Sequence, residues 1–147
     1  MMAIAPACEV VGFTAALGGY SDRWVGGAPG LTPLAISPRQ RLDDALKAVS
    51  GLPSRGRDCA LPMVWVSEQR REFDAFVVLT DNRTRAGKVH PSQALRAYRE
   101  RLGIPAKLVV VAMTSLGFSI ADPDDAGLLD VVGLDTATPR LIADFAS

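Results

Sequence analysis

The sequence predicts an α/β fold built on a doubly wound, mostly parallel sheet. Apolar runs of strand length alternate with segments of helical periodicity along the 147 residues, which is typical of a parallel sheet covered by helices. The runs at 73–80 and 106–114 are apolar almost throughout, as expected of strands buried on both faces. This length corresponds to about one domain, so we expect a single module over residues 1–147.

The first third of the chain predicts two strands separated by a loop. Residues 8–17 (CEVVGFTAAL) form a compact run rich in strand-forming residues. Residues 18–30 contain five glycines and a proline, which indicates a loop. Residues 31–36 predict a short strand at a sheet edge, because Pro33 cannot donate a hydrogen bond to a second neighbour.

Two helices are expected before residue 73. Ser37 and Pro38 match an N-cap and a first helical position, Gln40 closes a capping box, and Gly51 ends the helix. Four apolar residues share one face of this helix: Leu42, Ala45, Leu46 and Val49. The second helix should begin near Asp58 with Pro62 in its first turn. Its expected inward residues are Leu61, Val64 and Trp65.

The second half of the chain alternates strands and helices. A helix that starts at Pro91 separates the strands at 73–80 and 106–114, both interpreted as central strands. Its apolar face comprises Leu95, Tyr98 and Leu102, which directs Arg96, Arg99 and Arg101 largely outward. The last strand is expected at 128–134. Thr138 and Pro139 then match the cap and first position of a terminal helix that buries Leu141, Ile142 and Phe145.

The composition excludes several classes of protein. With 16 Lys and Arg against 16 Asp and Glu, and 48% hydrophobic residues, the chain is neither disordered nor a uniformly basic nucleic-acid binder. The charges are nevertheless separated, because all basic residues except Arg140 precede position 111, whereas six aspartates and no glutamate follow it. We therefore expect a basic region and an acidic end, an arrangement that can steer an anionic partner.

The cysteines and the chain start predict a cytoplasmic protein. Cys8 and Cys59 are far apart and have no Cys/His cluster around them, so neither a disulfide framework nor a zinc site is expected. The N-terminal residues lack the basic region of a secretory signal. No apolar run approaches the ~20 residues that a membrane span requires.

Candidate ligand-binding residues follow the predicted strands. In doubly wound sheets, ligands bind beyond the carboxyl ends of the strands, which directs attention to Asp81, Ser115 and Asp135. Asp81 could ligate Mg²⁺ or act as a base, but one carboxylate supplies too few ligands, and the residue could equally cap a turn. His90 is the only histidine and directly precedes Pro91, so we expect a capping or surface role. No catalytic motif occurs, and the chain is not expected to be an enzyme.

Two charged clusters have competing interpretations. The aspartates of ADPDDAG (121–127) suggest a calcium loop, but the EF-hand spacing is missing and Asx-type turns explain the pattern more simply. The basic residues after the strand at 73–80 and on the following helix could contact RNA phosphates or simply be solvated. The predicted phosphate contacts are Arg83, Arg85, Lys88, Arg96 and Arg99.

Several segments together resemble the C-terminal von Willebrand factor A domain of the Ro autoantigen (TROVE) proteins. These segments are VVGF (10–13), SPRQRLDD (37–44), RDCALPM (57–63) and residues 79–146, which include HPSQALRAYR, AKLVVVAMTSLGF and IADPDD. The resemblance implies a Rossmann-like A domain of a ribonucleoprotein, in which a ring of helical repeats binds small noncoding RNA and the A domain closes the ring. It also implies that the repeats and the first central strand are missing from this chain.

The resemblance further implies a degenerate metal site. Domains of this type carry a D-x-S-x-S motif after the first strand, a Thr on a second loop and an Asp on a third. Asp81 matches the third element, but Arg57 stands where the family has Thr before Asp58, and the first element has no counterpart. Because a guanidinium opposes a metal ion, we expect no cofactor unless a second chain supplies the ligand strand. Asp81 would then be free to pair with Arg57.

Three functional hypotheses follow. The leading one is a non-catalytic A-domain fragment of a Ro-type ribonucleoprotein that supports noncoding-RNA binding or associates with a protein or a second copy through its open sheet. The alternative is a metal-dependent adhesion module that binds a protein ligand after completion by a second chain. An enzyme such as a Mg²⁺-dependent phosphotransfer protein ranks third.

Overall fold

The computed structural model describes seven segments of the chain, namely residues 8–13, 31–37, 39–51, 59–80, 89–113, 122–133 and 135–147. The chain divides into two compact units, Met1–Asp58 and Cys59–Ser147.

The first unit contains a pair of antiparallel strands. Strand β1 (Val11–Phe13) pairs with β2 (Leu31–Pro33), with Val11 opposite Pro33 and Phe13 opposite Leu31. Both strands were predicted, at 8–17 and 31–36, but the described strands are shorter. The prediction of a loop over 18–30, like the second half of the first predicted strand, lies outside the described residues.

Helix α1 (Leu42–Ser50) begins later than predicted. The Gln40 side chain accepts a hydrogen bond from the Ser37 N–H (3.2 Å), and Ser37 Oγ accepts one from the Arg39 N–H (3.3 Å). These contacts belong to a separate turn before the helix. Arg41 (φ −68°, ψ 147°) is extended, so the helix does not continue back to Ser37. The expected apolar face exists, but Leu42 and Leu46 on it are 73% and 57% exposed.

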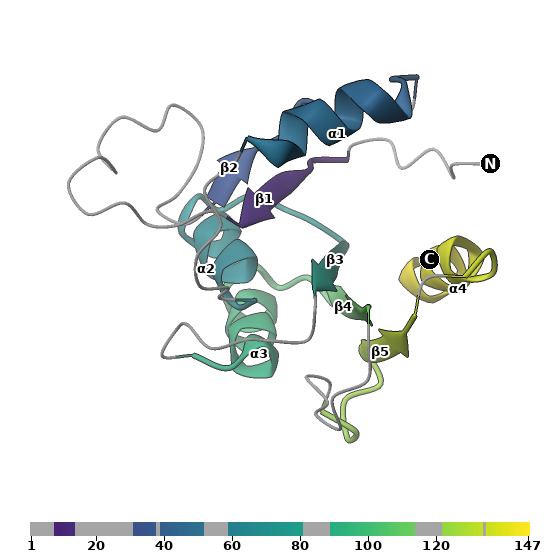
Figure 1. Cartoon of the computed structure of the whole chain (residues 1–147). Coiled ribbons are helices and arrows are strands. Elements are labelled where there is room, and N and C mark those ends of the chain that lie inside the picture. Colours follow the sequence, from purple (N-terminus) through teal and green to yellow (C-terminus); the bar gives the residue numbers. More distant parts are fainter. Residues whose placement is uncertain are drawn as a thin grey trace. The chain divides into compact units, whose positions relative to one another are not determined.

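The second unit is a parallel sheet between helices, as the predicted fold class requires. Its strands lie in the order β3 (Ala75–Thr80), β4 (Lys107–Ala112), β5 (Leu128–Val132), and both pairs are parallel. Figure 1 shows helices α2 (Leu61–Glu68) and α3 (Pro91–Leu102) on one side of this sheet and α4 (Thr138–Ala146) on the other.

The central strand of this sheet is β4, whose residues 108–112 are all buried. Strand β3 was also predicted to be central, but among the described strands it pairs only with β4. Its side chains alternate, with Phe76 and Val78 buried and Val77 and Leu79 exposed by 47% and 61%. An apolar run shows that a strand is suited to burial on both faces, but it does not show whether a neighbour is present to cover each one.

Tyr98 fixes α3 to the sheet. Its side chain is fully buried and its ring meets that of Phe76 edge to face, with centroids 5.0 Å apart. Its hydroxyl donates to the Arg71 carbonyl (2.8 Å) and accepts from the Phe73 N–H (2.7 Å). Burial, only partly offset by the hydrogen bond with Phe73, raises the pKa of Tyr98. Of the predicted inward face of α3, Leu95 is buried as well, whereas Leu102 is half-buried.

The inward face of α2 was predicted only in part. Trp65 is buried as expected, but its buried apolar neighbours are Met63 and Val66, whereas Leu61 and Val64 are half-buried. The helix is apolar around its whole circumference, so its periodicity could not select a face. Pro62 lies in the first turn as predicted.

Helix α4 is tied to the start of β4. Lys107 Nζ donates to the Phe145 carbonyl (2.8 Å) and lies 5.6 Å from the centre of the Phe145 ring. Phe145 and Ile142 are half-buried, but Leu141, which was expected inside, is 46% exposed. In the described residues, no helix combines the length and hydrophobicity needed to cross a bilayer.

Candidate nucleic-acid interface

The structure describes only some of the predicted site residues. The candidate metal and ligand positions Arg57, Asp58, Asp81 and Ser115 lie outside the described residues. The same holds for three of the five predicted phosphate contacts, Arg83, Arg85 and Lys88. Arg96 and Arg99 are described, together with His90, Asp135 and the three aspartates at 122, 124 and 125.

His90 caps helix α3, as the sequence predicted. Its Nδ1 accepts a hydrogen bond from the Ser92 N–H (3.2 Å) and lies 2.8 Å from Ser92 Oγ. The Gln93 side chain completes a capping box by accepting the His90 N–H (3.4 Å). Because Nδ1 acts as an acceptor of the backbone N–H, this ring serves to start the helix.

Asp135 binds the first backbone N–H groups of helix α4. The helix begins at Thr138 with Ala137 at the N-cap, so the prediction of Thr138 as the cap was wrong. Its Oδ1 accepts from the Ala137 N–H (2.8 Å), the Thr138 N–H (3.0 Å) and the Thr138 hydroxyl (3.2 Å). The hydrogen bond from Ala137, followed by those from Thr138, lowers the pKa of this carboxyl. Asp135 was one of three residues expected to bind a ligand because they follow predicted strands. One of its carboxylate oxygens is instead bound to the start of the next helix.

The aspartates at 122–125 form turns, which confirms that interpretation. Asp122 Oδ1 accepts the Asp124 N–H (3.0 Å), and Asp125 Oδ1 accepts the Gly127 N–H (2.8 Å). Both contacts are Asx-type turns in which a carboxylate bonds the backbone two residues later. Within the described segments, no group of three or more His, Cys, Asp or Glu is arranged to hold a metal ion.

Arg99 is directed into the structure, contrary to the prediction that it points largely outward. Its Nε donates to the Ala106 carbonyl (2.7 Å) and its Nη1 to Asp125 Oδ2 (2.6 Å). Ala106 directly precedes β4 and Gly127 directly precedes β5, so this guanidinium lies where two strands start. A Cβ at Gly127 would collide with Arg99 Nη2, so a larger residue there would have to displace the end of the Arg99 side chain.

The Arg99–Asp125 pair is largely shielded from water. The two side chains are 23% and 15% exposed. Burial by itself raises the pKa of Asp125. The hydrogen bonds from Arg99 and Gly127, together with the positive charges of Arg99 and Arg96, outweigh this effect, so the pKa of the carboxyl lies below its ordinary value. This pair is a structural contact that leaves Arg99 little capacity to bind another anion.

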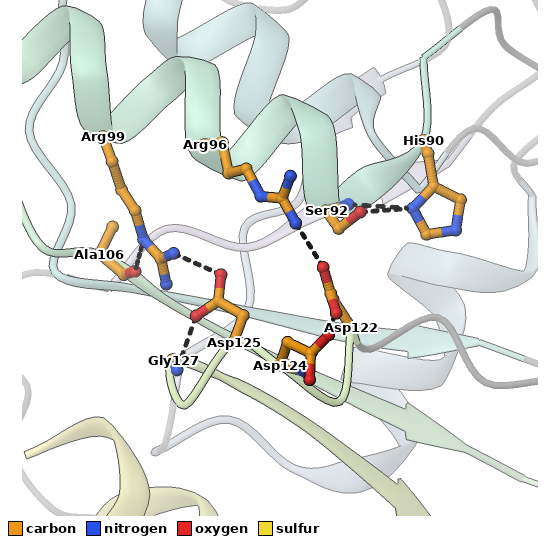
Figure 2. A network of polar contacts seen from close by, with 9 residues as sticks. All are labelled: His90, Ser92, Arg96, Arg99, Ala106, Asp122, Asp124, Asp125 and Gly127. Carbon is orange, nitrogen blue, oxygen red and sulfur yellow. Dashed lines mark hydrogen bonds and ion pairs between the residues drawn. The ribbon is translucent and has the colours of Figure 1, made fainter.

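Arg96 lies one turn earlier on α3 and pairs with Asp122 Oδ2 through Nη2. Figure 2 shows both arginines reaching from α3 toward the segment 122–127. The Arg96 side chain is 54% exposed and that of Asp122 24%. Of the two arginines, Arg96 is therefore the one that solvent and ligands can reach.

Sequence reasoning did not foresee that these two clusters would meet. The basic residues of α3 and the aspartates were considered separately, although each pair joins residues 26 positions apart. The opposite charges of the two regions were the available signal. The residues of α3 repeat at helical spacing on one face, which suits them to contact a single acidic segment.

Comparison with known proteins identifies the family. A family model described as "Ro60 vWA domain" matches residues 2–146. The chain belongs to the Ro60 vWA domain family. The expected resemblance to the A domain of Ro-type proteins is thereby confirmed.

Two proteins named "RNA-binding protein RO60" are similar to this Ro60 vWA chain. The one from Deinococcus radiodurans is 44% identical over 122 residues, which are 83% of this chain and 23% of that protein. The one from Caenorhabditis elegans is 42% identical over 118 residues, or 80% of this chain and 18% of that protein. The chain thus spans about a fifth of the length of these relatives.

A solved structure supports the same assignment. The crystal structure of the Deinococcus radiodurans RO (RSR) protein superposes on this Ro60 vWA chain with a TM-score of 0.72 and 45% sequence identity, covering 79% of this chain and 23% of that one. The α/β fold with a parallel sheet is the fold of this neighbour, as predicted from the alternation of strands and helices.

Proposed function

We propose that this vWA domain is a non-catalytic module of a cytoplasmic Ro-type ribonucleoprotein, in which it supports the binding of small noncoding RNA or associates with a protein. Membership of the Ro60 vWA domain family and the names of the two relatives support an RNA-binding context. The matched region is 23% and 18% of those relatives. We therefore assign the main RNA-binding surface, a ring of helical repeats, to parts outside the matched region.

This assignment is carried by one observation, which is that the two arginines of α3 are already paired with carboxylates. Arg99 donates to Asp125 and Ala106, and Arg96 donates to Asp122. Guanidinium groups that already bind carboxylates are less available to phosphates. The chain by itself should therefore bind RNA weakly, mainly through phosphates, and with a strong dependence on salt.

The test is a titration of the isolated chain with a fluorescently labelled single-stranded oligouridylate and a labelled RNA hairpin, followed by anisotropy at several salt concentrations. We expect weak binding to both, with similar affinities and a linear fall of log K with log salt. Replacing Arg83, Arg85 and Lys88 with Gln should weaken both equally. The matched control removes three positive charges elsewhere, at Arg39, Arg41 and Arg140.

Two results would contradict this proposal. One is tight binding at physiological salt that distinguishes the hairpin from the oligouridylate, since it would place a specific RNA site within this chain. The other is an equal loss of affinity in the control variant, because a general charge effect would then replace defined phosphate contacts.

A second candidate function is a metal-dependent adhesion module whose remaining ligands come from another polypeptide. The observation in its favour is that β3 ends at Thr80, so Asp81 is the next residue after the carboxyl end of a parallel strand, where this class of sheet binds ligands. Here the Arg57 guanidinium would oppose the ion. A calorimetric titration of the chain with Mg²⁺ or Mn²⁺ separates this function from the first.

A further inference from the structure

The ion pair between Arg96 and Asp122 lies at the surface. Asp122 Oδ2 contacts the guanidinium through Nη2, whereas an arginine has five N–H donors. More than half of the Arg96 side chain, 54%, is exposed. A phosphate from solvent can therefore reach this guanidinium and compete with the Asp122 carboxylate for it.

Asp122 is held in position by its own turn. Its Oδ1 accepts the Asp124 N–H at 3.0 Å, which leaves Oδ2 to face Arg96, as Figure 2 shows. The turn fixes the carboxylate without help from the arginine, so the carboxylate remains beside Arg96 at little further entropic cost. A carboxylate and a phosphate accept hydrogen bonds from a guanidinium in the same geometry.

We propose that Asp122 is an internal mimic of phosphate that masks Arg96, so that a phosphate group of single-stranded RNA binds Arg96 only by displacing the Asp122 carboxylate. This inference rests on the proposed function, because it assigns a regulatory contact to one of the predicted phosphate-binding residues. The masked site is a single guanidinium on the exposed face of α3.

The neighbouring pair shows why Arg96 is the group that changes partner. Exposed ion pairs are weak and are screened by salt, which suits Arg96 and Asp122 to reversible opening. Arg99 differs because it also donates to the Ala106 carbonyl and is 23% exposed, beside a carboxylate that is 15% exposed. Breaking the Arg96–Asp122 ion pair therefore leaves the starts of β4 and β5 in place.

The test compares Asp122→Asn with the control Asp124→Asn. Both variants remove one negative charge, but the exposed Asp124 side chain is not the partner of Arg96. In Asp122→Asn, the amide oxygen can still accept the Asp124 N–H and preserve the turn. Asp122→Ser is a second variant that removes the charge and keeps a short oxygen acceptor. Thermal melts confirm that each variant is folded.

The probes are a labelled decauridylate and, separately, inorganic polyphosphate. We expect Asp122→Asn to bind both about 3- to 10-fold more tightly than the unmodified chain, with a salt dependence steeper by about 0.7 for RNA, as one added phosphate contact requires. Asp124→Asn should gain much less. The double variant Arg96→Gln/Asp122→Asn should lose the gain.

The outcomes separate this inference from the proposed function. Tighter binding of polyphosphate by Asp122→Asn, with no RNA binding by any variant, would support the mask and contradict the RNA role. Binding of RNA by all variants, with equal affinities for Asp122→Asn and Asp124→Asn toward both probes, would overturn the mask and leave the RNA role intact. A gain that persists in the double variant would also overturn it, because Arg96 would then not be the unmasked group.

Discussion

Arg99 and Asp125 show how one residue pair organises the amino-terminal edge of the parallel sheet. The guanidinium bonds the carbonyl of Ala106 before β4 and a carboxylate that itself holds the N–H of Gly127 before β5. Removing either partner would leave the charge of the other largely shielded from water and without its ion-pair partner.

The pH dependence of stability should reveal this pair. Because the pKa of Asp125 is lowered in the folded chain, its contribution is complete above the ordinary aspartate value of 3.8 and is lost as the pH falls through the lower folded value. We expect Asp125→Asn to lower the free energy of unfolding by about 1–3 kcal/mol at neutral pH. Urea denaturation at neutral pH and at pH about 3 measures both effects.

The control for this prediction is again Asp124→Asn, which changes the same charge outside the Arg99 contacts. Its unfolding curve should stay close to that of the unmodified chain. Equal stability of Asp125→Asn and the unmodified chain at neutral pH would show that the pair is not stabilising. A difference that does not shrink in acid would show that the carboxylate charge is not its source.

At the scale of elements, two helices end with a residue in the left-handed region. Helix α3 ends at Gly103 (φ 67°), whose N–H bonds the Arg99 carbonyl (2.8 Å). After α2, the same region is occupied by Arg70 (φ 52°), a residue with a Cβ. Glycine adopts this conformation without the steric cost that other residues incur.

Exchanging the residue type at these two ends should change stability in opposite directions. We expect Arg70→Gly to raise the free energy of unfolding by about 0.5–1 kcal/mol and Gly103→Ala to lower it by about 1 kcal/mol. A Cβ at Gly103 meets nothing within 4 Å, so the second effect reports backbone strain alone. Denaturant midpoints test both. A stabilising Gly103→Ala or a destabilising Arg70→Gly would show that helix-end strain does not govern these positions.

At the scale of the whole molecule, β3 lies at the edge of the described three-stranded sheet, with β4 on its other side. The carbonyls of Asp74 and Thr80 accept from Lys107 and Met113 on the β4 side, so the backbone groups of Val77 and Leu79 point toward the opposite edge. An unpaired apolar edge favours aggregation. We therefore predict that this edge is covered by residues 8–17, by a second copy or by a partner chain.

Amide hydrogen exchange measures this directly. If the edge is covered, the N–H groups of Val77 and Leu79 should be as protected as those of Phe76 and Val78, which face β4. Concentration dependence of the protection would identify a second copy. The prediction fails if Val77 and Leu79 exchange rapidly in a soluble monomer that unfolds reversibly in one step.

A complete metal site in this fold would need ligands from several loops of the molecule. With Asp81 as the remaining predicted ligand and Arg57 at a second ligand position, we expect no specific binding of Mg²⁺ or Mn²⁺ in the micromolar range. Calorimetric titration of the isolated chain tests this. A stoichiometric micromolar site that Asp81→Ala abolishes would contradict it. Arg57→Thr alone should not create a site, since the serine ligands would still be missing.

The sequence by itself determined the elements and the family. Alternating apolar runs predicted the parallel strands, Pro91 and Pro139 marked helix starts, and the two Asx-type turns followed from the spacing of the aspartates. These features depend on residues close together in the chain, where propensity and hydrogen bonding are local. The resemblance to the Ro-type A domain likewise rested on contiguous segments, and the family comparison confirmed it.

Only the tertiary structure decided which charges meet and which faces are covered. Arg96 and Arg99 were both expected to point largely outward. Arg96 does so, although Asp122 pairs with it, whereas Arg99 is turned inward against Asp125. Val77 and Leu79 are as apolar as the buried residues of the same strand, yet their side chains are exposed. The physical reason is the same in both cases, because the partner of a side chain is set by chain segments distant in sequence, and local patterns record only what a residue is suited to contact.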